Sequence, residues 1–288
     1  MRRSQKIGVA LILLVLFLPV IGLAQTPARK LAMYPSGEDG SRLLYTSGDL
    51  RIAVNNTDGR FTIGTSLGKS LLFGFPNEGA TSHAHFFVND SIWGTYLNDG
   101  GMHPTPAPVT LNPMISSGSI VSRYIVDGIE FTQRLTPTYW GDNPTVLIEY
   151  TAVNTTSLTK QVGVLLFLDT MIGDNDYAPI ATEYGYFAVE REFISPDIPT
   201  YWQAFESSPW QPPDSLIGGG VLVGGSAVPP DRVVFGDFWS MHNVRWNYTL
   251  TGEPYSDSAV LFRWDAGSLA PGASRRMATY YGQGSAII

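Results

Sequence analysis

Short apolar runs that alternate with turn residues dominate the chain from Leu43 onward. Turn formers such as Gly, Asn and Asp separate these runs, and this pattern is typical of β-strands joined by hairpins. The earliest runs lie at 50–54, 60–63 and 70–75. The clearest hairpin has Asp127-Gly128 at its centre, because this pair tolerates the positive φ angles of a type I′ turn.

Two later segments, 145–153 and 161–168, are apolar on both alternating sets of positions. Strands of this kind are covered on both faces, and their polar link 154–160 predicts that the two pair antiparallel. Outside the N-terminus no stretch has the apolar spacing of a helix. The chain is therefore predicted to be all-β: a large two-sheet antiparallel β-sandwich with little helix, folded as one domain over 43–288.

The N-terminus has a different character. Three basic residues precede an apolar run of about 15 residues, and Gly22-Leu23-Ala24 closes it with small residues, which together predict a secretory signal peptide at 1–24. A retained anchor is the alternative, but a spanning helix needs about 20 residues. We therefore expect a secreted protein (extracellular, periplasmic or at the cell surface) with no membrane span after cleavage. Residues 25–42 are polar and predict a flexible leader.

Composition limits the classes of partner that the protein is expected to bind. The formal net charge is −7, so nucleic acid is excluded as a natural partner. Charged residues make up only 15% of the chain. The chain has no cysteine, which excludes thiol catalysis and cysteine-bound metals. A glycan, a protein or a divalent cation fits better. The leader 25–42 is also a candidate for oligomer formation, by adding to the sheet edge of a neighbouring copy.

An acidic cluster follows the apolar strand that ends at Leu168. Carboxylate and amide oxygens are the ligands that Ca²⁺ prefers, so a calcium site is predicted at Asp169, Asp174, Asn175 and Asp176. The alternative is a turn whose side chains bond their own backbone. If 145–153 pairs with 161–168, Asp142 would also lie near this cluster.

Two histidines stand two positions apart at His83 and His85, so they share a face if this segment is a strand. An imidazole is a general acid or base near neutral pH, and two of them with a carboxylate hold zinc-like metals. Histidines that only fill the core edge are the alternative.

The longest irregular segment, 194–213, is rich in Pro and Trp. Loops of this length are usually functional or cover a sheet edge. Tyr201, Trp202 and Trp210 are the ligand-binding candidates here, because flat rings stack on sugars and anchor protein partners. Trp202 and Trp210 are expected to be exposed.

Several motifs in the second half occur in a recognisable order: Asp169-Thr, Gly173-Asp-Asn-Asp176, 198–205, 230–235, Asp257-Ser-Ala-Val260 and 269–282. This order resembles uncharacterised secreted prokaryotic β-sandwich proteins and the large supersandwich of galactose-mutarotase-like domains. Mutarotases use a histidine with a glutamate base. The resemblance therefore implies His83, His85 and Glu149 as catalytic candidates, although no motif links them.

Two functions follow as hypotheses. The main one is a secreted non-catalytic β-sandwich, a binding or cell-envelope module that binds glycan and is stabilised by a cation. The alternative is a carbohydrate-active enzyme, mutarotase-like or glycan-processing, that uses histidine and carboxylate acid–base chemistry.

Overall fold

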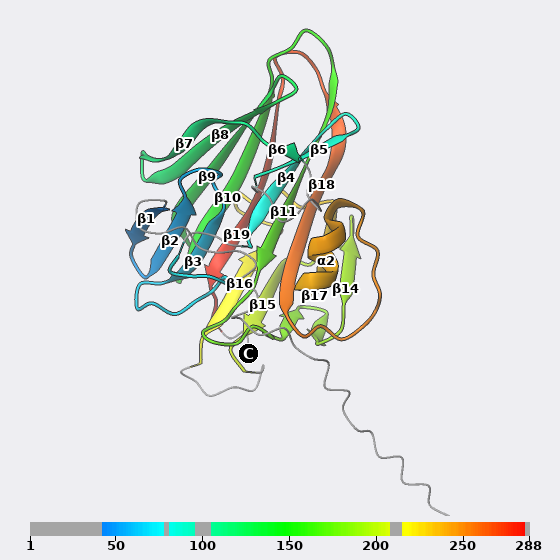
Figure 1. Cartoon of the computed structure of the whole chain (residues 1–288). Coiled ribbons are helices and arrows are strands. Elements are labelled where there is room, and N and C mark those ends of the chain that lie inside the picture. The colour runs from blue at the N-terminus through cyan, green and yellow to red at the C-terminus, as the bar shows by residue number, and fades with distance from the viewer. Residues whose placement is uncertain (1–41, 78–80, 96–104, 208–214, 286–288) are drawn as a thin grey trace, which may run out of the picture.

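The computed structural model describes residues 42–77, 81–95, 105–207 and 215–285, and within them it is a β-sandwich (Figure 1). One layer is a nine-stranded sheet in which every neighbouring pair is antiparallel. Its strands, in spatial order, are β13 (Gly185–Phe187), β12 (Ile180–Thr182), β15 (Tyr201–Phe205), β16 (Ile217–Val221), β19 (Ser274–Gln283), β10 (Asn143–Asn154), β9 (Ile129–Trp140), β8 (Ser119–Val126) and β7 (Val109–Ser116).

The second layer is a seven-stranded sheet, antiparallel except for a short parallel pairing of its last two strands. Its strands, in spatial order, are β14 (Arg191–Ile194), β17 (Arg232–Asp237), β18 (Ser258–Leu269), β11 (Lys160–Asp169), β4 (His83–Val88), β5 (Ser91–Gly94) and β6 (Thr105–Pro106). Helix α2 (Phe238–Val244) and the 3₁₀ turn η1 (Arg245–Asn247) cover its outer face.

A small third sheet consists of β1 (Arg42–Ser47), β2 (Leu50–Asn55) and β3 (Phe61–Thr65). Its apolar residues belong to the same core as those of the sandwich, and it lies against β8 and β9 (Figure 1). Buried hydrogen bonds join them: the Tyr124 hydroxyl donates to the Asp58 carbonyl at 2.9 Å, and the Gln133 amide to the Gly59 carbonyl at 2.8 Å.

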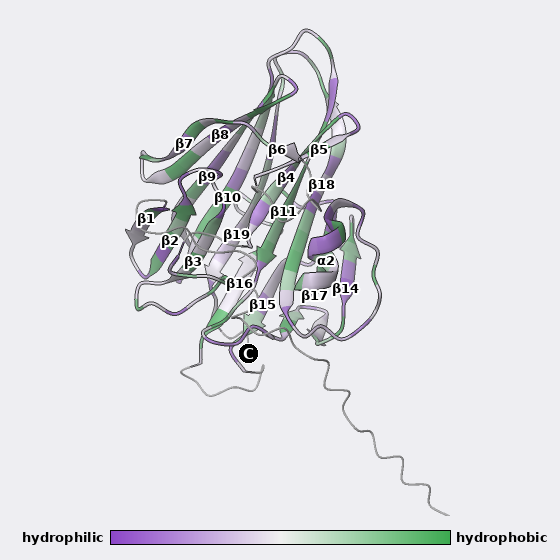
Figure 2. Ribbon diagram, in the orientation of Figure 1, coloured by the Kyte–Doolittle hydropathy of each residue, from purple (hydrophilic) through white to green (hydrophobic). Residues whose placement is uncertain are grey.

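Alternation along the strands builds the core. In β10 the even-numbered residues from Val146 to Ala152 face the other sheet and are buried, whereas the odd-numbered residues face outward. β11 is buried almost throughout, because the sandwich covers one face and α2 covers the other. Figure 2 shows β11 as hydrophobic over most of its length. No helix among the described residues is long and apolar enough to cross a membrane.

The predicted all-β class and the antiparallel sandwich are confirmed, with the small third sheet as an addition. The predicted hairpin is also confirmed, since Asp127 and Gly128 have φ angles of 46° and 74°. Arg42, assigned to the leader from sequence, begins β1. Residues 1–41, which hold the predicted signal peptide and the rest of the leader, lie outside the described residues.

Two strand predictions were wrong. β10 and β11 do not pair, because β10 lies between β9 and β19 in one sheet and β11 between β18 and β4 in the other. Their link crosses from layer to layer instead of making a hairpin. The segment 70–75 forms turns with single bridges at Ser70 and Leu72, and not a strand.

Glycines in β16 allow a large side chain to pack against the strand. Trp202 lies opposite Gly220 and is fully buried, with its ring stacked on Tyr281 at a centroid distance of 5.2 Å. A Cβ atom on Gly220 would lie 2.2 Å from Trp202 Nε1 and 2.8 Å from the Tyr280 carbonyl oxygen. The preceding residue, Gly219, faces the outer side of the sheet, where a Cβ would meet its nearest atoms at 3.5 Å.

Gly220→Ala should therefore destabilise the protein, whereas Gly219→Ala should not. We expect Gly220→Ala to lower the free energy of unfolding by about 1–3 kcal/mol or more through overpacking, measured by urea denaturation. Gly219→Ala is the matched control and should stay within about 0.5 kcal/mol of the wild type. Equal stability of the two variants would contradict the packing of Trp202 on β16.

Candidate functional site

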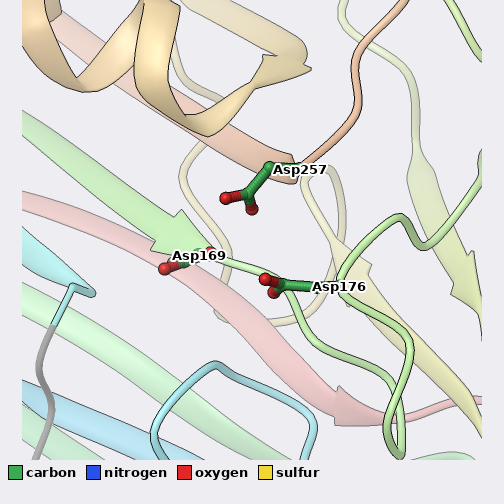
Figure 3. Close-up of side chains that lie close together, drawn as sticks. All are labelled: Asp169, Asp176 and Asp257. Atoms are coloured by element: carbon green, nitrogen blue, oxygen red, sulfur yellow. The ribbon is translucent and has the colours of Figure 1, made fainter. Parts of the chain in front are cut away.

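Three acidic side chains meet at one end of the seven-stranded sheet (Figure 3). Asp169 ends β11, Asp257 immediately precedes β18, and Asp176 comes from the turn that follows β11. All three are buried, and one carboxylate oxygen from each lies within 4.8 Å of the others. Ionised carboxylates at this separation repel one another. A hard divalent cation would offset this repulsion, because such cations prefer oxygen ligands.

Strand pairing explains why these residues meet. β11 and β18 are antiparallel, with Asp169 opposite Ala259, so the end of one strand adjoins the start of the other. The backbone amide of Ser258 donates to the Asp176 carbonyl at 2.8 Å, which fixes the turn beside β18. The Asp169 amide donates to the Ser82 hydroxyl at 3.1 Å.

The structure places the predicted metal ligands in two groups. Asp169 and Asp176 lie in the buried trio, but Asp174 is exposed. The Asn175 side chain forms the predicted alternative, a local turn, because its oxygen accepts from the Tyr177 amide at 2.9 Å. Its amide donates to the carbonyl of the distant Glu206 at 2.8 Å. Asp257, the third member of the trio, is not among the ligands predicted from sequence, although its position just before an apolar strand mirrors that of Asp169 just after one.

His83 and His85 share one face of β4, as the spacing predicts, but that face is covered by α2. They form a buried cluster with His242 and Arg245, and His83 lies 5.0 Å from His85 and 5.5 Å from His242 between ring centroids. Arg245 donates to His242 Nε2 at 2.8 Å and approaches His85 Nε2 at 3.4 Å. His83 Nδ1 lies 2.6 Å from the Thr81 carbonyl and therefore carries the proton.

Both strand histidines are held in the neutral form. Burial lowers the pKa of His83 well below its usual value, and the charge of Arg245 lowers it further. The pKa of His85 is lowered in the same way, first by burial and then by Arg245. The lowered pKa values keep both imidazoles uncharged in the folded protein at neutral pH, each with a single ring proton.

Glu149, the carboxylate implied as a base, does not join the histidines. It points outward from β10, in the other sheet, and forms an ion pair with Arg276 of the adjacent strand β19. The sandwich therefore separates Glu149 from His83 and His85, and no acid–base pair forms from these three residues.

A pocket of about 190 Å³ opens on the outer face of the nine-stranded sheet. The end of β9 and the start of β10 form one wall with Trp140, Asn143 and Thr145, and β15 forms the opposite wall with Tyr201 and Gln203. The floor is formed by β16 and the end of β19, where Gly219 adds no side chain. Tyr201, predicted as a ligand-binding residue, thus lies in the pocket wall.

The other two aromatic residues predicted to bind a ligand are Trp202 and Trp210. Trp202 was expected to be exposed and is fully buried, because the segment predicted as an irregular loop contains β15. Alternation along β15 sends Trp202 into the core and its neighbours Tyr201 and Gln203 to the pocket. Trp210 lies outside the described residues.

No protein-family model matches the chain, and no curated protein matches its sequence. Solved structures do match its fold. One is described as a candidate aldose 1-epimerase from Escherichia coli K12, with a TM-score of 0.50 and 12% identity over 85% of this chain and 99% of that one.

Two further structures are a galactose mutarotase-like protein from Lactobacillus casei ATCC 334 and a galactose mutarotase related enzyme from Lactobacillus acidophilus. The first has a TM-score of 0.47 and 10% identity over 84% of this chain and 100% of that chain. The second has a TM-score of 0.44 and 8% identity over 85% and 98%, respectively. The chain therefore shares its fold with the Escherichia coli structure, as the resemblance to a large supersandwich implied.

The expected cation is best tested at the aspartate trio. If Ca²⁺ binds there, a concentration 100 times Kd should stabilise the fold by about 2.7 kcal/mol and raise Tm by roughly 5–10 °C. Asp257→Asn should abolish the rise, whereas Asp174→Asn, which alters an exposed carboxylate of the same segment, should keep it. An unchanged Tm of the wild type in Ca²⁺, Mg²⁺ and Mn²⁺ would end the cation hypothesis.

The buried histidines predict acid sensitivity. Unfolded histidine titrates near pH 6.5, above the folded pKa, so their contribution is complete above that pH and is lost as the pH falls below it. We expect the free energy of unfolding to fall by up to about 1.4 kcal/mol per pH unit for each of His83 and His85, measured by urea denaturation between pH 7.5 and 5. His83→Phe should reduce this slope by about half. A flat profile would mean that these histidines are not held neutral.

Proposed function

We propose that the protein is carbohydrate-active and binds a sugar in the pocket between β9–β10 and β15. The observation that carries this proposal is the composition of the pocket. Two aromatic side chains, Trp140 and Tyr201, lie among neutral amides, and the wall and floor residues include no charged side chain. Aromatic faces pack against the apolar faces of sugar rings, and amide groups both donate to and accept from hydroxyls.

The fold supports the same class of ligand. The structure from Escherichia coli with the same fold is described as a candidate aldose 1-epimerase, a class that acts on sugars. This likeness favours the carbohydrate-active alternative from the sequence over a non-catalytic module of the cell envelope. The signal-peptide pattern at 1–24 supports export, so the sugar would be met outside the cytoplasm.

Epimerisation of an aldose is the second candidate, and the fold is the observation that favours it. Acid–base catalysis requires a titratable group within hydrogen-bond reach of the reacting sugar atoms. Among the residues that line the pocket, Tyr201 is the one titratable side chain. An epimerase would speed the exchange of α and β anomers, which NMR measures directly, whereas a binding protein would leave that rate unchanged.

Glycan-array screening, followed by titration calorimetry of the best sugar, tests the proposal. We expect Tyr201→Ala to weaken binding by roughly tenfold, about 1.4 kcal/mol. Gly219→Val should abolish binding, because its side chain would fill the floor of the pocket while its Cβ is accommodated. Tyr186→Ala is the matched control: Tyr186 is an exposed tyrosine of β13 in the same sheet, outside the pocket, and its loss should leave binding unchanged. Failure of every sugar to bind, or binding unaffected by Gly219→Val, would reject the proposed site.

A further inference from the structure

We infer that Asn247 is an attachment site for an N-linked glycan. The chain contains four Asn-X-Ser/Thr sequons, which begin at Asn55, Asn89, Asn154 and Asn247. In an exported protein such a sequon accepts a glycan where it lies on the surface. The inference rests on the export that residues 1–24 predict, and it is independent of the pocket. Burial and hydrogen bonding of the four asparagines separate Asn247 from the other three.

The sequon at Asn154 is part of a buried turn. Asn154 is fully buried, and its side-chain amide donates to the carbonyls of Leu158 and Leu269, each at 2.8 Å. Its Oδ1 accepts from the Thr156 backbone amide at 3.0 Å and from the Thr156 hydroxyl at 2.7 Å. The threonine of this sequon therefore closes a turn on the asparagine. A glycan on Asn154 Nδ2 would break both hydrogen bonds to the carbonyls.

The sequons at Asn55 and Asn89 also serve the fold. Asn55 is buried, and its Oδ1 accepts from the Thr57 backbone amide at 2.8 Å and from the Thr57 hydroxyl at 2.6 Å. Asn89 is half-buried and held at both ends of its side chain. Its Oδ1 accepts from the Gln161 amide at 3.1 Å, and its Nδ2 donates to Asp127 at 3.4 Å. A glycan on Nδ2 would displace the contact with Asp127.

Asn247 differs from all three. It is exposed, as is Thr249 of the same sequon. Among the residues that the structure describes, no hydrogen bond holds the Asn247 side chain. The 3₁₀ turn η1 ends at this residue, and residues 248–253 belong to no helix or strand. The sequon therefore has the surface position that a glycan requires.

The neighbours of Asn247 explain why its side chain projects into solvent. Trp246 and Tyr248 are both buried in the apolar cluster beneath α2. Arg263 donates to the Trp246 carbonyl at 3.0 Å, and Arg232 donates to the Tyr248 carbonyl at 2.6 Å. The backbone on both sides of Asn247 is thus fixed to the seven-stranded sheet. A glycan here would lie on the layer opposite to the pocket and leave the pocket open.

Attachment requires an oligosaccharide linked to a lipid pyrophosphate and an oligosaccharyltransferase, which the chain would meet during export. The amide nitrogen of Asn247 attacks the anomeric carbon of the donor. A C–N bond forms, the C–O bond to the pyrophosphate breaks, the lipid pyrophosphate leaves and the amide nitrogen loses one proton. Transfer to the exported chain precedes folding, so a glycan on Asn154 would prevent its turn from forming. A glycan on Asn247 displaces no side-chain hydrogen bond among the described residues.

The first experiment locates the glycan. The full chain is secreted from a eukaryotic host that carries out N-glycosylation, and the folded product is treated with peptide-N-glycosidase, which converts each modified asparagine to aspartate. We expect peptide mass spectrometry to find this conversion at Asn247 and not at Asn55 or Asn154. Thr249→Ala should abolish the modification of Asn247, and the matched control Thr249→Ser should retain it. An unmodified Asn247, or folded protein that carries a glycan on Asn154, would overturn the inference.

The second experiment separates the two kinds of sequon by their effect on stability. Asn247→Gln should remove the glycan and leave Tm of the enzymatically deglycosylated protein unchanged. Asn154→Gln should leave the glycan on Asn247 in place but lower Tm, because buried carbonyls lose their donors. A fall in Tm for Asn247→Gln as large as that for Asn154→Gln would show that the Asn247 side chain serves the fold, which contradicts the inference.

Discussion

The alternation of side chains along paired strands is the constraint on which the rest of this structure depends. Every second residue of β10, β15 and β19 enters the shared apolar layer, where a polar group without a partner is costly. Chemistry is therefore confined to the outer faces of the sheets and to the strand ends. The pocket occupies an outer face and the aspartate trio a set of strand ends, as this constraint requires.

The pocket exists largely because glycines at its floor carry no side chain. β16 contains three consecutive glycines at 218–220. Because successive residues of a strand face opposite sides of the sheet, neighbouring glycines make room on different faces. Gly220 leaves room for Trp202 in the core, and Gly219 leaves a hollow on the outer face. Among the residues that the structure describes, the buried Thr145 hydroxyl beside that hollow has no hydrogen-bond partner. Residues that do not favour the stability of their own element often mark a functional site. We therefore place the sugar in this pocket and not at the histidine cluster beneath α2.

Local patterns predicted the local structure. The Asp127-Gly128 turn and the all-β class could be recognised from the sequence. Turn preferences and the two-residue alternation of apolar and polar positions both depend only on residues that are close in the chain. The sheet partners of β11 could not, since β18 and β4 lie far away in the sequence and nothing in the segment itself selects them. The error over Trp202 has a similar origin, because β15 is short and lies in a Pro-rich segment that reads as a loop.

The candidate site was only partly predictable for the same reason. Tyr201, which lines the pocket, could be named from the sequence because an aromatic residue in a polar segment is a local feature. Gln203, Thr145 and Gly219 were missed, because they meet only through strand pairing. Asp257 joins Asp169 and Asp176 through the pairing of β11 with β18. Only a prediction of long-range register would have found these residues.

The most direct measurement is a ¹H–¹⁵N NMR titration of the full chain with the best-binding sugar. The account predicts that the largest shifts fall on the backbone amides of Gly219, Val221 and Ser285 and on the Trp140 indole, and that the amides of His83 and His242 stay in place. Shifts that gather on β4 and α2, with the pocket residues unmoved, would contradict the account.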